Sequence, residues 1–151
     1  KQYSVPFIIN DNVEVAIKCN ADGIHVGQSD MSANDIRKLV GDKMIIGVSA
    51  NSVAQAKEAS RNGADYLGVG AVFSTTTKLD ANAIPHSVVH AICDSVDIPI
   101  VAIGGINKEN ILELSGTGID GVALVSAIFA SSDIENECKS LRYLSEKMVK
   151  S

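Results

Sequence analysis

The stretch Ala21-Asp22-Gly23-Ile24-His25-Val26-Gly27-Gln28-Ser29-Asp30 decides the fold. It turns from the end of a helical stretch into an apolar strand and leaves that strand through glycine and polar residues. The same step from a helix end into a strand recurs at Ala64-Asp65-Tyr66-Leu67 and at Ile119-Asp120-Gly121-Val122. The spacing is irregular, so the sequence indicates a recurring supersecondary unit rather than a solenoid.

Short apolar runs rich in Val and Ile alternate with longer amphipathic stretches, which is typical of strand and helix units around a parallel sheet. We predict six strands, at residues 5–10, 23–26, 44–49, 66–70, 98–103 and 121–125. No linker or charge block divides residues 1–151, so we predict a single domain. Two α/β architectures fit, an open doubly wound sheet and a closed (β/α)8 TIM barrel. Six strands alone favour the open sheet, because the barrel needs eight strands and about 200 residues or more.

Local signals mark the ends of the predicted helices. Serine N-caps, each followed three residues later by a side chain that can return a hydrogen bond, are predicted at Ser32, Ser52 and Ser132. Glycines predicted to end helical stretches are Gly41, Gly63 and Gly116.

The composition excludes several classes of function. The chain has 18 acidic and 13 basic side chains, a net charge of -5 and no run of Lys or Arg, which argues against binding nucleic acid or an anionic membrane. Its apolar stretches are far shorter than the roughly 20 residues of a membrane helix. The three cysteines form no C-x-x-C pair and fit reduced thiols. We expect a cytoplasmic protein, and the oligomeric state stays open, a homo-oligomer included.

Carboxylates follow two neighbouring predicted strands. Ligands gather at the carboxyl ends of strands in both architectures. Asp11 and Asp30 leave adjacent strands there, so they could bring two hard oxygen ligands to one Mg²⁺ ion. The alternative is that Asp11 caps a helix that begins near Asn12 and that Asp30 lies in a turn.

Two further strand exits are suited to phosphate. Residues 74–80 hold four consecutive hydroxyl side chains followed by Lys78, a row of neutral donors that ends in one cation. The alternative for this segment is a flexible polar loop. Gly104-Gly105 lets the backbone approach an anion, Asn107 is predicted to begin a helix with free N–H groups, and Ser126 supplies a donor from the last strand. The last two βα loops of TIM barrels often form such a phosphate site.

The histidines point less clearly to chemistry. His25 lies within a predicted strand, where a packed structural histidine is the favoured interpretation over a catalytic one. His86 and His90 are four residues apart in a predicted helix, but without a third ligand a solvent-exposed face is favoured over a metal pair. No serine-hydrolase elbow, zinc-protease motif or P-loop is present in the sequence.

Taken together, these segments resemble one family. They are PFIIND (6–11), ADGIHVGQSD (21–30), IGVSA (46–50), GADYLGVG (63–70), TTTK (75–78), VAIGGI (101–106) and VSAI (125–128). In this order they resemble thiamine-phosphate synthase, also called thiamine-phosphate pyrophosphorylase. That family is a (β/α)8 barrel, so the resemblance implies that the six strands are the third to the eighth. The chain would then form the C-terminal three-quarters of a TIM barrel.

The resemblance also implies an activity. The family is a Mg²⁺-dependent transferase that joins 4-amino-2-methyl-5-(diphosphooxymethyl)pyrimidine to 4-methyl-5-(2-phosphooxyethyl)thiazole and releases pyrophosphate. It implies that Asp11 and Asp30 bind Mg²⁺, with Asn10 beside them near the pyrimidine diphosphate. Ser49 and Lys78 resemble the catalytic residues that bind pyrophosphate. The residues that resemble its thiazole-phosphate contacts are Thr75, Thr77, Gly105, Val125 and Ser126.

Two features depart from the family pattern. The first two strands of the family, with a Gln-x-Arg-x-Lys segment that grips the diphosphate, have no counterpart here, so we expect this chain to be part of a longer protein of roughly 200 residues. Asn51 stands where many members have histidine. The alternatives are a related thiazole tautomerase, which relies on that histidine, and a non-catalytic phosphate-binding fragment of a barrel.

Overall fold

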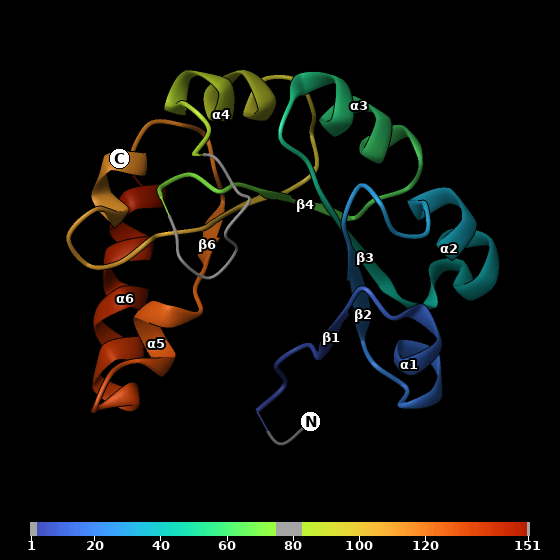
Figure 1. Ribbon diagram of the computed structural model, residues 1–151, viewed down its shortest axis with the longest axis horizontal. Coiled ribbons are helices and arrows are strands. Elements are labelled where there is room, and N and C mark those ends of the chain that lie inside the picture. The colour runs from blue at the N-terminus through green and yellow to red at the C-terminus, as the bar shows by residue number, and fades with distance from the viewer. Residues whose placement is uncertain (1–2, 75–82, 151) are drawn as a thin grey trace.

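A computed structural model describes residues 3–74 and 83–150 of the chain (Figure 1). The strands are β1 (Ile8–Asn10), β2 (Gly23–Val26), β3 (Ile45–Ser49), β4 (Tyr66–Val69), β5 (Ile100–Ile103) and β6 (Gly121–Ala123). The α-helices are α1 (Val13–Lys18), α2 (Ala33–Val40), α3 (Val53–Arg61), α4 (His86–Cys93), α5 (Ser126–Phe129) and α6 (Ile134–Val149). Two short 3₁₀ helices, η1 (Gly41–Lys43) and η2 (Ile111–Leu114), complete the described elements.

Strand order decides between the two architectures. The six strands form one parallel sheet in the order β1-β2-β3-β4-β5-β6, so every strand pairs with its neighbours in sequence. A doubly wound sheet instead reverses its strand order near the middle. The sheet curls, and helices α1 to α4 follow its outer side (Figure 1). The fold is therefore a curled α/β half-barrel, and the open doubly wound alternative is wrong.

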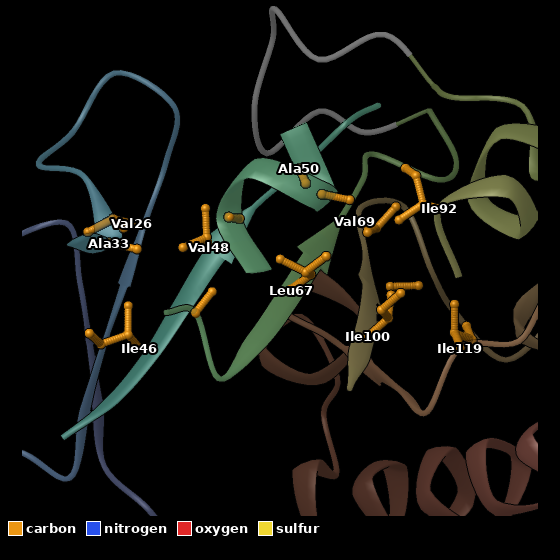
Figure 2. Packing of buried hydrophobic residues seen from close by; sticks show 14 of the residues in the cluster. Val26, Ala33, Ile46, Val48, Ala50, Leu67, Val69, Ile92, Ile100 and Ile119 are labelled. Carbon is orange, nitrogen blue, oxygen red and sulfur yellow. The ribbon is translucent and has the colours of Figure 1, made fainter. Parts of the chain in front are cut away.

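Alternation along the strands separates a packed outer face from an open inner face. Successive strand residues point to opposite sides of a sheet. The outward-facing residues of β2 to β5 are buried: Ile24, Val26, Ile46, Val48, Leu67, Val69, Ile100 and Ala102. They belong to one core cluster with helix residues such as Ala16, Ile36, Ala56 and Ile92, part of which Figure 2 shows. The alanines among these residues let the helices lie close against the sheet. The side chains of the inner face lie on the other side of the sheet from these helices.

An aspartate recurs at each of the three turns from a helix end into a strand, and it has a structural role. At each turn its carboxylate accepts a hydrogen bond from a backbone N–H at or near the start of the preceding strand. Asp22 binds the Phe7 N–H (2.8 Å), Asp65 binds that of Ile46 (2.7 Å), and Asp120 binds that of Ile100 (2.7 Å). The aspartate therefore fixes the pairing of consecutive parallel strands, which explains why the pattern recurs along the chain.

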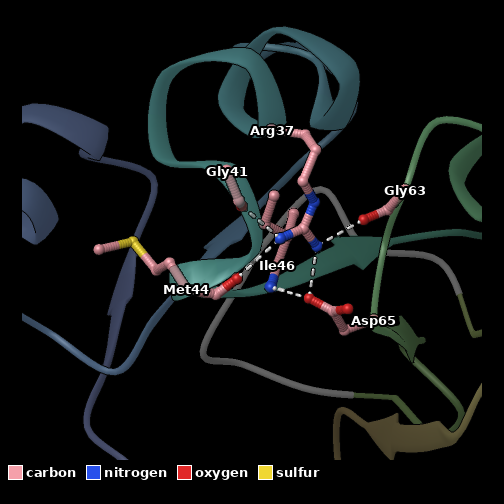
Figure 3. Close-up of polar contacts among 6 residues, drawn as sticks. All are labelled: Arg37, Gly41, Met44, Ile46, Gly63 and Asp65. Carbon is pink, nitrogen blue, oxygen red and sulfur yellow. Dashed lines mark hydrogen bonds and ion pairs between the residues drawn. The ribbon is translucent and has the colours of Figure 1, made fainter.

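At the turn that contains Asp65, Arg37 adds further hydrogen bonds (Figure 3). Its Nη2 lies 2.7 Å from the Asp65 carboxylate and donates to the Gly63 carbonyl oxygen at 2.8 Å. Its Nη1 donates to the carbonyl oxygens of Gly41 (2.8 Å) and Met44 (3.0 Å). One guanidinium thus joins the end of α2, the start of β3 and the turn before β4.

Most predicted helix ends are confirmed. Ser32 and Ser52 are N-caps. The Ser32 side chain accepts a hydrogen bond from the Asp35 N–H, and the Ser52 side chain accepts one from the Gln55 N–H. The predicted Ser132 cap is wrong by one residue, because Asp133 accepts from the Asn136 N–H instead. Gly116 follows a 3₁₀ helix rather than an α-helix. Among the described helices, none is long and apolar enough to span a bilayer.

A candidate active site at the carboxyl ends of the strands

The carboxyl ends of the parallel strands lie along one side of the sheet. In the observed register Asn10 lies opposite His25, Ser49 opposite Gly68, and Ile103 opposite Ala123. Because all strands run in the same direction, the residues that follow them emerge at the same edge. The predicted exits of all six strands therefore share one side of the fold.

Asp11 is held in an unusual backbone conformation directly after β1. Its φ of 65° lies in the left-handed region, which aspartate tolerates better than most residues, and its N–H donates to the His25 carbonyl oxygen at 2.8 Å. The helix-capping alternative is wrong, because Asn12 caps α1 through its side chain. Within residues 3–74 and 83–150, no hydrogen bond or ion pair involves the Asp11 carboxylate. That exposed carboxylate is available to a ligand.

Asp30 is partly engaged within its own turn. One carboxylate oxygen accepts from the Gly27 N–H at 2.7 Å, and the Asp30 N–H returns a bond of 3.3 Å to the Gly27 carbonyl oxygen. The turn alternative therefore describes this residue correctly, although its second carboxylate oxygen is unused by that turn. Among the described residues no group of three His, Cys, Asp or Glu side chains could hold a metal ion. Two exposed carboxylates on adjacent strand exits still fit Mg²⁺, which commonly takes one or two carboxylates together with water and substrate phosphate.

A polar trio (Tyr66, His25 and Ser49) occupies the inner face of the sheet. His25 Nδ1 lies 2.9 Å from the Tyr66 hydroxyl oxygen, and His25 Nε2 lies 3.0 Å from Ser49 Oγ. Gln28 Nε2 donates to the Ser49 carbonyl oxygen at 2.6 Å, which ties the exit of β2 to the end of β3. Ser49, predicted as a pyrophosphate contact, is thus fixed through both its side chain and its backbone.

Glycines make room for the polar trio. A Cβ on Gly47 would collide with the Tyr66 ring, and one on Gly68 would lie 2.9 Å from His25 Cε1. Burial lowers the pKa of His25, against a smaller opposing effect of the Asp11 charge, and burial raises the pKa of Tyr66. Both rings therefore favour their neutral forms, as hydrogen-bonding groups rather than charges.

A small cavity of about 100 Å³ lies between the last two strand exits. Its lining includes three predicted thiazole-phosphate contacts, Gly105, Val125 and Ser126. Gly104 and Gly105 have positive φ values of 98° and 67°, and a Cβ on Gly105 would lie 2.8 Å from the Phe73 Cβ. Glycine is required there because the chain turns tightly against the exit of β4.

The predicted helix at Asn107 is wrong. Residues after Asn107 form a turn and then the short η2 helix. The Asn107 N–H donates to Asn110 Oδ1 at 2.8 Å, and Asn110 Nδ2 donates to the Gly105 carbonyl oxygen at 2.9 Å. The Asn110 side chain therefore stabilises the glycine turn. It also accepts from the Asn107 N–H, the group that the sequence predicts to be free for an anion.

Other sequence predictions have separate outcomes. Thr75, Thr77 and Lys78 lie outside the described residues, so their roles stay predictions. His86 packs edge-on against Phe73, with ring centroids 5.3 Å apart, and His90 is exposed. The Asn51 amide fits its surroundings when its nitrogen faces the carbonyl oxygens of Ala50 and Gly70, to which it would then donate at 3.1 and 2.6 Å. Such bonds are structural, and an amide lacks the proton-transfer capacity of a tautomerase histidine.

Comparison with known proteins places this chain in a family. The profile of the family described as thiamine monophosphate synthase matches residues 1–128. The chain belongs to the thiamine monophosphate synthase family. A thiamine-phosphate synthase of Clostridium tetani is 49% identical over 140 residues, which are 93% of this chain and 67% of that protein. One from Methanobrevibacter smithii is 49% identical over 150 residues, 99% of this chain and 68% of that protein.

A solved structure agrees with this membership of the thiamine monophosphate synthase family. The thiamine phosphate pyrophosphorylase of Pyrococcus furiosus superposes with a TM-score of 0.89 at 40% identity. The match covers 98% of this chain and 71% of that protein. This chain therefore spans about two thirds of the length of the relatives that it matches.

Sequence reasoning did not place His25 and Tyr66 together in the polar trio. The sequence favours a packed structural histidine at position 25, which agrees with the hydrogen bonds of both ring nitrogens, and it does not assign Tyr66 to the site. The signal was the strand alternation, because Ile24 and Val26 are buried on the outer face and therefore place His25 on the inner one. Glycines at 47 and 68 on the same face indicate that large neighbouring side chains fill the space above them.

Proposed function

We propose that this protein is a thiamine-phosphate synthase that joins the pyrimidine diphosphate to the thiazole phosphate and releases pyrophosphate. The observation that carries the proposal is the exposed Asp11 carboxylate, which lies beside the neutral polar trio at the carboxyl ends of the strands, where the small cavity at Gly105 and Ser126 also lies. Carboxylates suit a metal-bound diphosphate, and the Gly104-Gly105 turn with Ser126 suits a phosphate. Two relatives that are 49% identical to this chain are called thiamine-phosphate synthases.

The reaction needs little from acidic or basic side chains. The C–O bond to pyrophosphate breaks, the amino-substituted pyrimidine ring stabilises the methylene cation left behind, and the thiazole nitrogen captures it. Asp11 and Asp30 would hold Mg²⁺, and the ion would supply positive charge to offset that of the departing pyrophosphate. Asn10, Ser49 and Lys78 would donate to its oxygens.

Orientation of the second substrate is the other requirement of this chemistry. Gly105, Val125 and Ser126, with Thr75 and Thr77, would bind the thiazole phosphate and direct the thiazole nitrogen toward the cation. Neutral donors are sufficient for that task, because the phosphate needs to be held in place rather than activated.

We further propose that the half-barrel is part of a complete (β/α)8 barrel in a single domain. The sheet curls and ends at β1 and β6, whose outer edges are unpaired among the described strands. Exposed apolar side chains flank both ends, including Val5 and Phe7 before β1 and Phe129 after β6. Two additional βα units would cover these edges. The proposal extends to a cytoplasmic location, in keeping with the composition.

A direct assay tests the activity. The protein incubated with both phosphorylated substrates and Mg²⁺ is expected to form thiamine phosphate and pyrophosphate. Asp11→Ala and Lys78→Ala are each expected to lower turnover by about 100-fold or more, because Asp11 would hold the Mg²⁺ ion and Lys78 would supply positive charge to the leaving pyrophosphate. Lys18→Ala, which removes an exposed lysine paired with Glu14, is the matched control and should keep full turnover. Undiminished turnover in Asp11→Ala would contradict the proposed role.

A further inference from the structure

The polar trio forms a chain of hydrogen bonds whose direction matters. His25 uses both ring nitrogens, Nδ1 toward Tyr66 and Nε2 toward Ser49. A neutral imidazole has one donor and one acceptor nitrogen, so two arrangements satisfy the geometry. In the first, the Tyr66 hydroxyl donates to Nδ1, and Nε2–H donates to Ser49 Oγ. In the second, the Ser49 hydroxyl donates to Nε2, and Nδ1–H donates to the Tyr66 oxygen.

Acid strength favours the first arrangement. A phenol is a much stronger acid than an aliphatic alcohol, and the stronger acid makes the stronger hydrogen bond to an imidazole lone pair. With the Tyr66 hydroxyl donating to Nδ1, the ring proton resides on Nε2 and is donated to Ser49 Oγ. Ser49 then accepts from the ring and keeps its own hydroxyl proton for a ligand.

The same arrangement suits an anionic ligand. The side chain of Ser49 is held by His25, and its carbonyl oxygen is held by Gln28, so the direction of the hydroxyl is restricted. A Ser49 hydroxyl that donated to His25 would present only lone pairs to the inner face, and lone pairs repel a diphosphate. The first arrangement instead presents a donor.

We propose that Tyr66 and His25 are positioning residues that set the Ser49 hydroxyl as a hydrogen-bond donor to the diphosphate of the pyrimidine substrate. The inference rests on the proposed function for the identity of the anion. Tyr66 and His25 act through Ser49 in this account, and neither touches the reacting atoms.

The position of the ring proton can be measured without any substrate. Long-range ¹H–¹⁵N correlation spectra at pH 8 distinguish protonated from unprotonated imidazole nitrogens. The chain has three histidines, and the signals missing from the spectrum of a His25→Gln variant assign those of His25. We expect a protonated Nε2 and an unprotonated Nδ1. A proton on Nδ1, or on both nitrogens, would overturn the proposal.

A double-mutant cycle tests whether the effect passes through Ser49. Tyr66→Phe is expected to raise the KM for the pyrimidine diphosphate about 3- to 10-fold, the loss of one well-placed hydrogen bond. In a Ser49→Ala background, the same change should raise KM no further, because the hydroxyl that it orients is gone. Tyr143→Phe removes an exposed hydroxyl on α6 and serves as the matched control.

The outcomes separate this inference from the proposed function. Independent, multiplicative effects of Tyr66→Phe and Ser49→Ala on KM would show that Tyr66 acts on the fold alone, and would overturn the positioning role. A wild-type protein that forms no thiamine phosphate would contradict the proposed function, whereas the NMR spectrum would still report the ring proton.

Discussion

Cys93 shows how the fold sets the chemistry of a single residue. Its thiol is partly buried at the end of α4, and burial, with smaller contributions from Asp120 and Asp94, raises its pKa from 9.0 to about 11. Cys19 and Cys138 are exposed. Because the thiolate is the reactive form, the fold makes Cys93 the least reactive of the three described thiols.

Thiol labelling measures this difference. Iodoacetamide at pH 8 is expected to alkylate Cys19 and Cys138 well before Cys93, with the order read by peptide mass spectrometry. The sign follows from the raised pKa, since less Cys93 thiolate exists at any pH below about 11. In urea the three rates should converge. Alkylation of Cys93 first in the folded protein would contradict this account.

At the scale of an element, Arg37 joins three segments that are distant in sequence. Arg37→Gln is expected to lower the free energy of unfolding by about 2 to 4 kcal/mol, because the carbonyl oxygens of Gly41, Met44 and Gly63 and the Asp65 carboxylate lose their donor. Urea denaturation measures the change. Arg142→Gln, which removes only an exposed pair with Glu146 on α6, should change stability little. Equal losses in the two variants would argue against the proposed role of Arg37.

Strands β3 and β4 depend on glycine where the polar trio crosses them. Gly47→Ala places a methyl group inside the Tyr66 ring, so the ring must move away from His25. We expect a loss of about 1 to 3 kcal/mol of stability from this overpacking. Gly121→Ala on β6 meets no atom within 4 Å and should leave stability unchanged or slightly increased. Thermal unfolding of both variants measures the contrast, and an unaffected Gly47→Ala variant would contradict the packing described.

The elements were largely predictable from sequence, and their ends were less so. All six strands were predicted near their observed positions, because Val and Ile runs between helical stretches are a strong local signal. The first was predicted from residue 5 and begins at Ile8, since Pro6 lacks an N–H and the Phe7 N–H binds the Asp22 side chain instead of a neighbouring strand. The Asn107 helix failed because the Asn110 side chain competes for the N–H that a helix would leave free.

At the scale of the whole molecule, the sequence located the edge of the sheet but not the network on its inner face. Asn10, Asp11, Ser49, Gly105 and Ser126 were recognised one strand exit at a time, and the parallel sheet brings those exits to one edge. The contact between His25 and Tyr66 joins residues 41 positions apart. It depends on the register between strands, which is not readable from a local motif.

We propose that the carboxyl ends of the strands bind a metal-complexed pyrophosphate through Asp11. Isothermal titration of pyrophosphate into the protein, with and without Mg²⁺, tests it most directly. We predict binding that requires Mg²⁺, that is lost in Asp11→Asn and that is retained in Asp42→Asn, whose carboxylate lies before β3 at the opposite edge of the sheet. Binding that needs no Mg²⁺, or that survives in Asp11→Asn, would contradict the account.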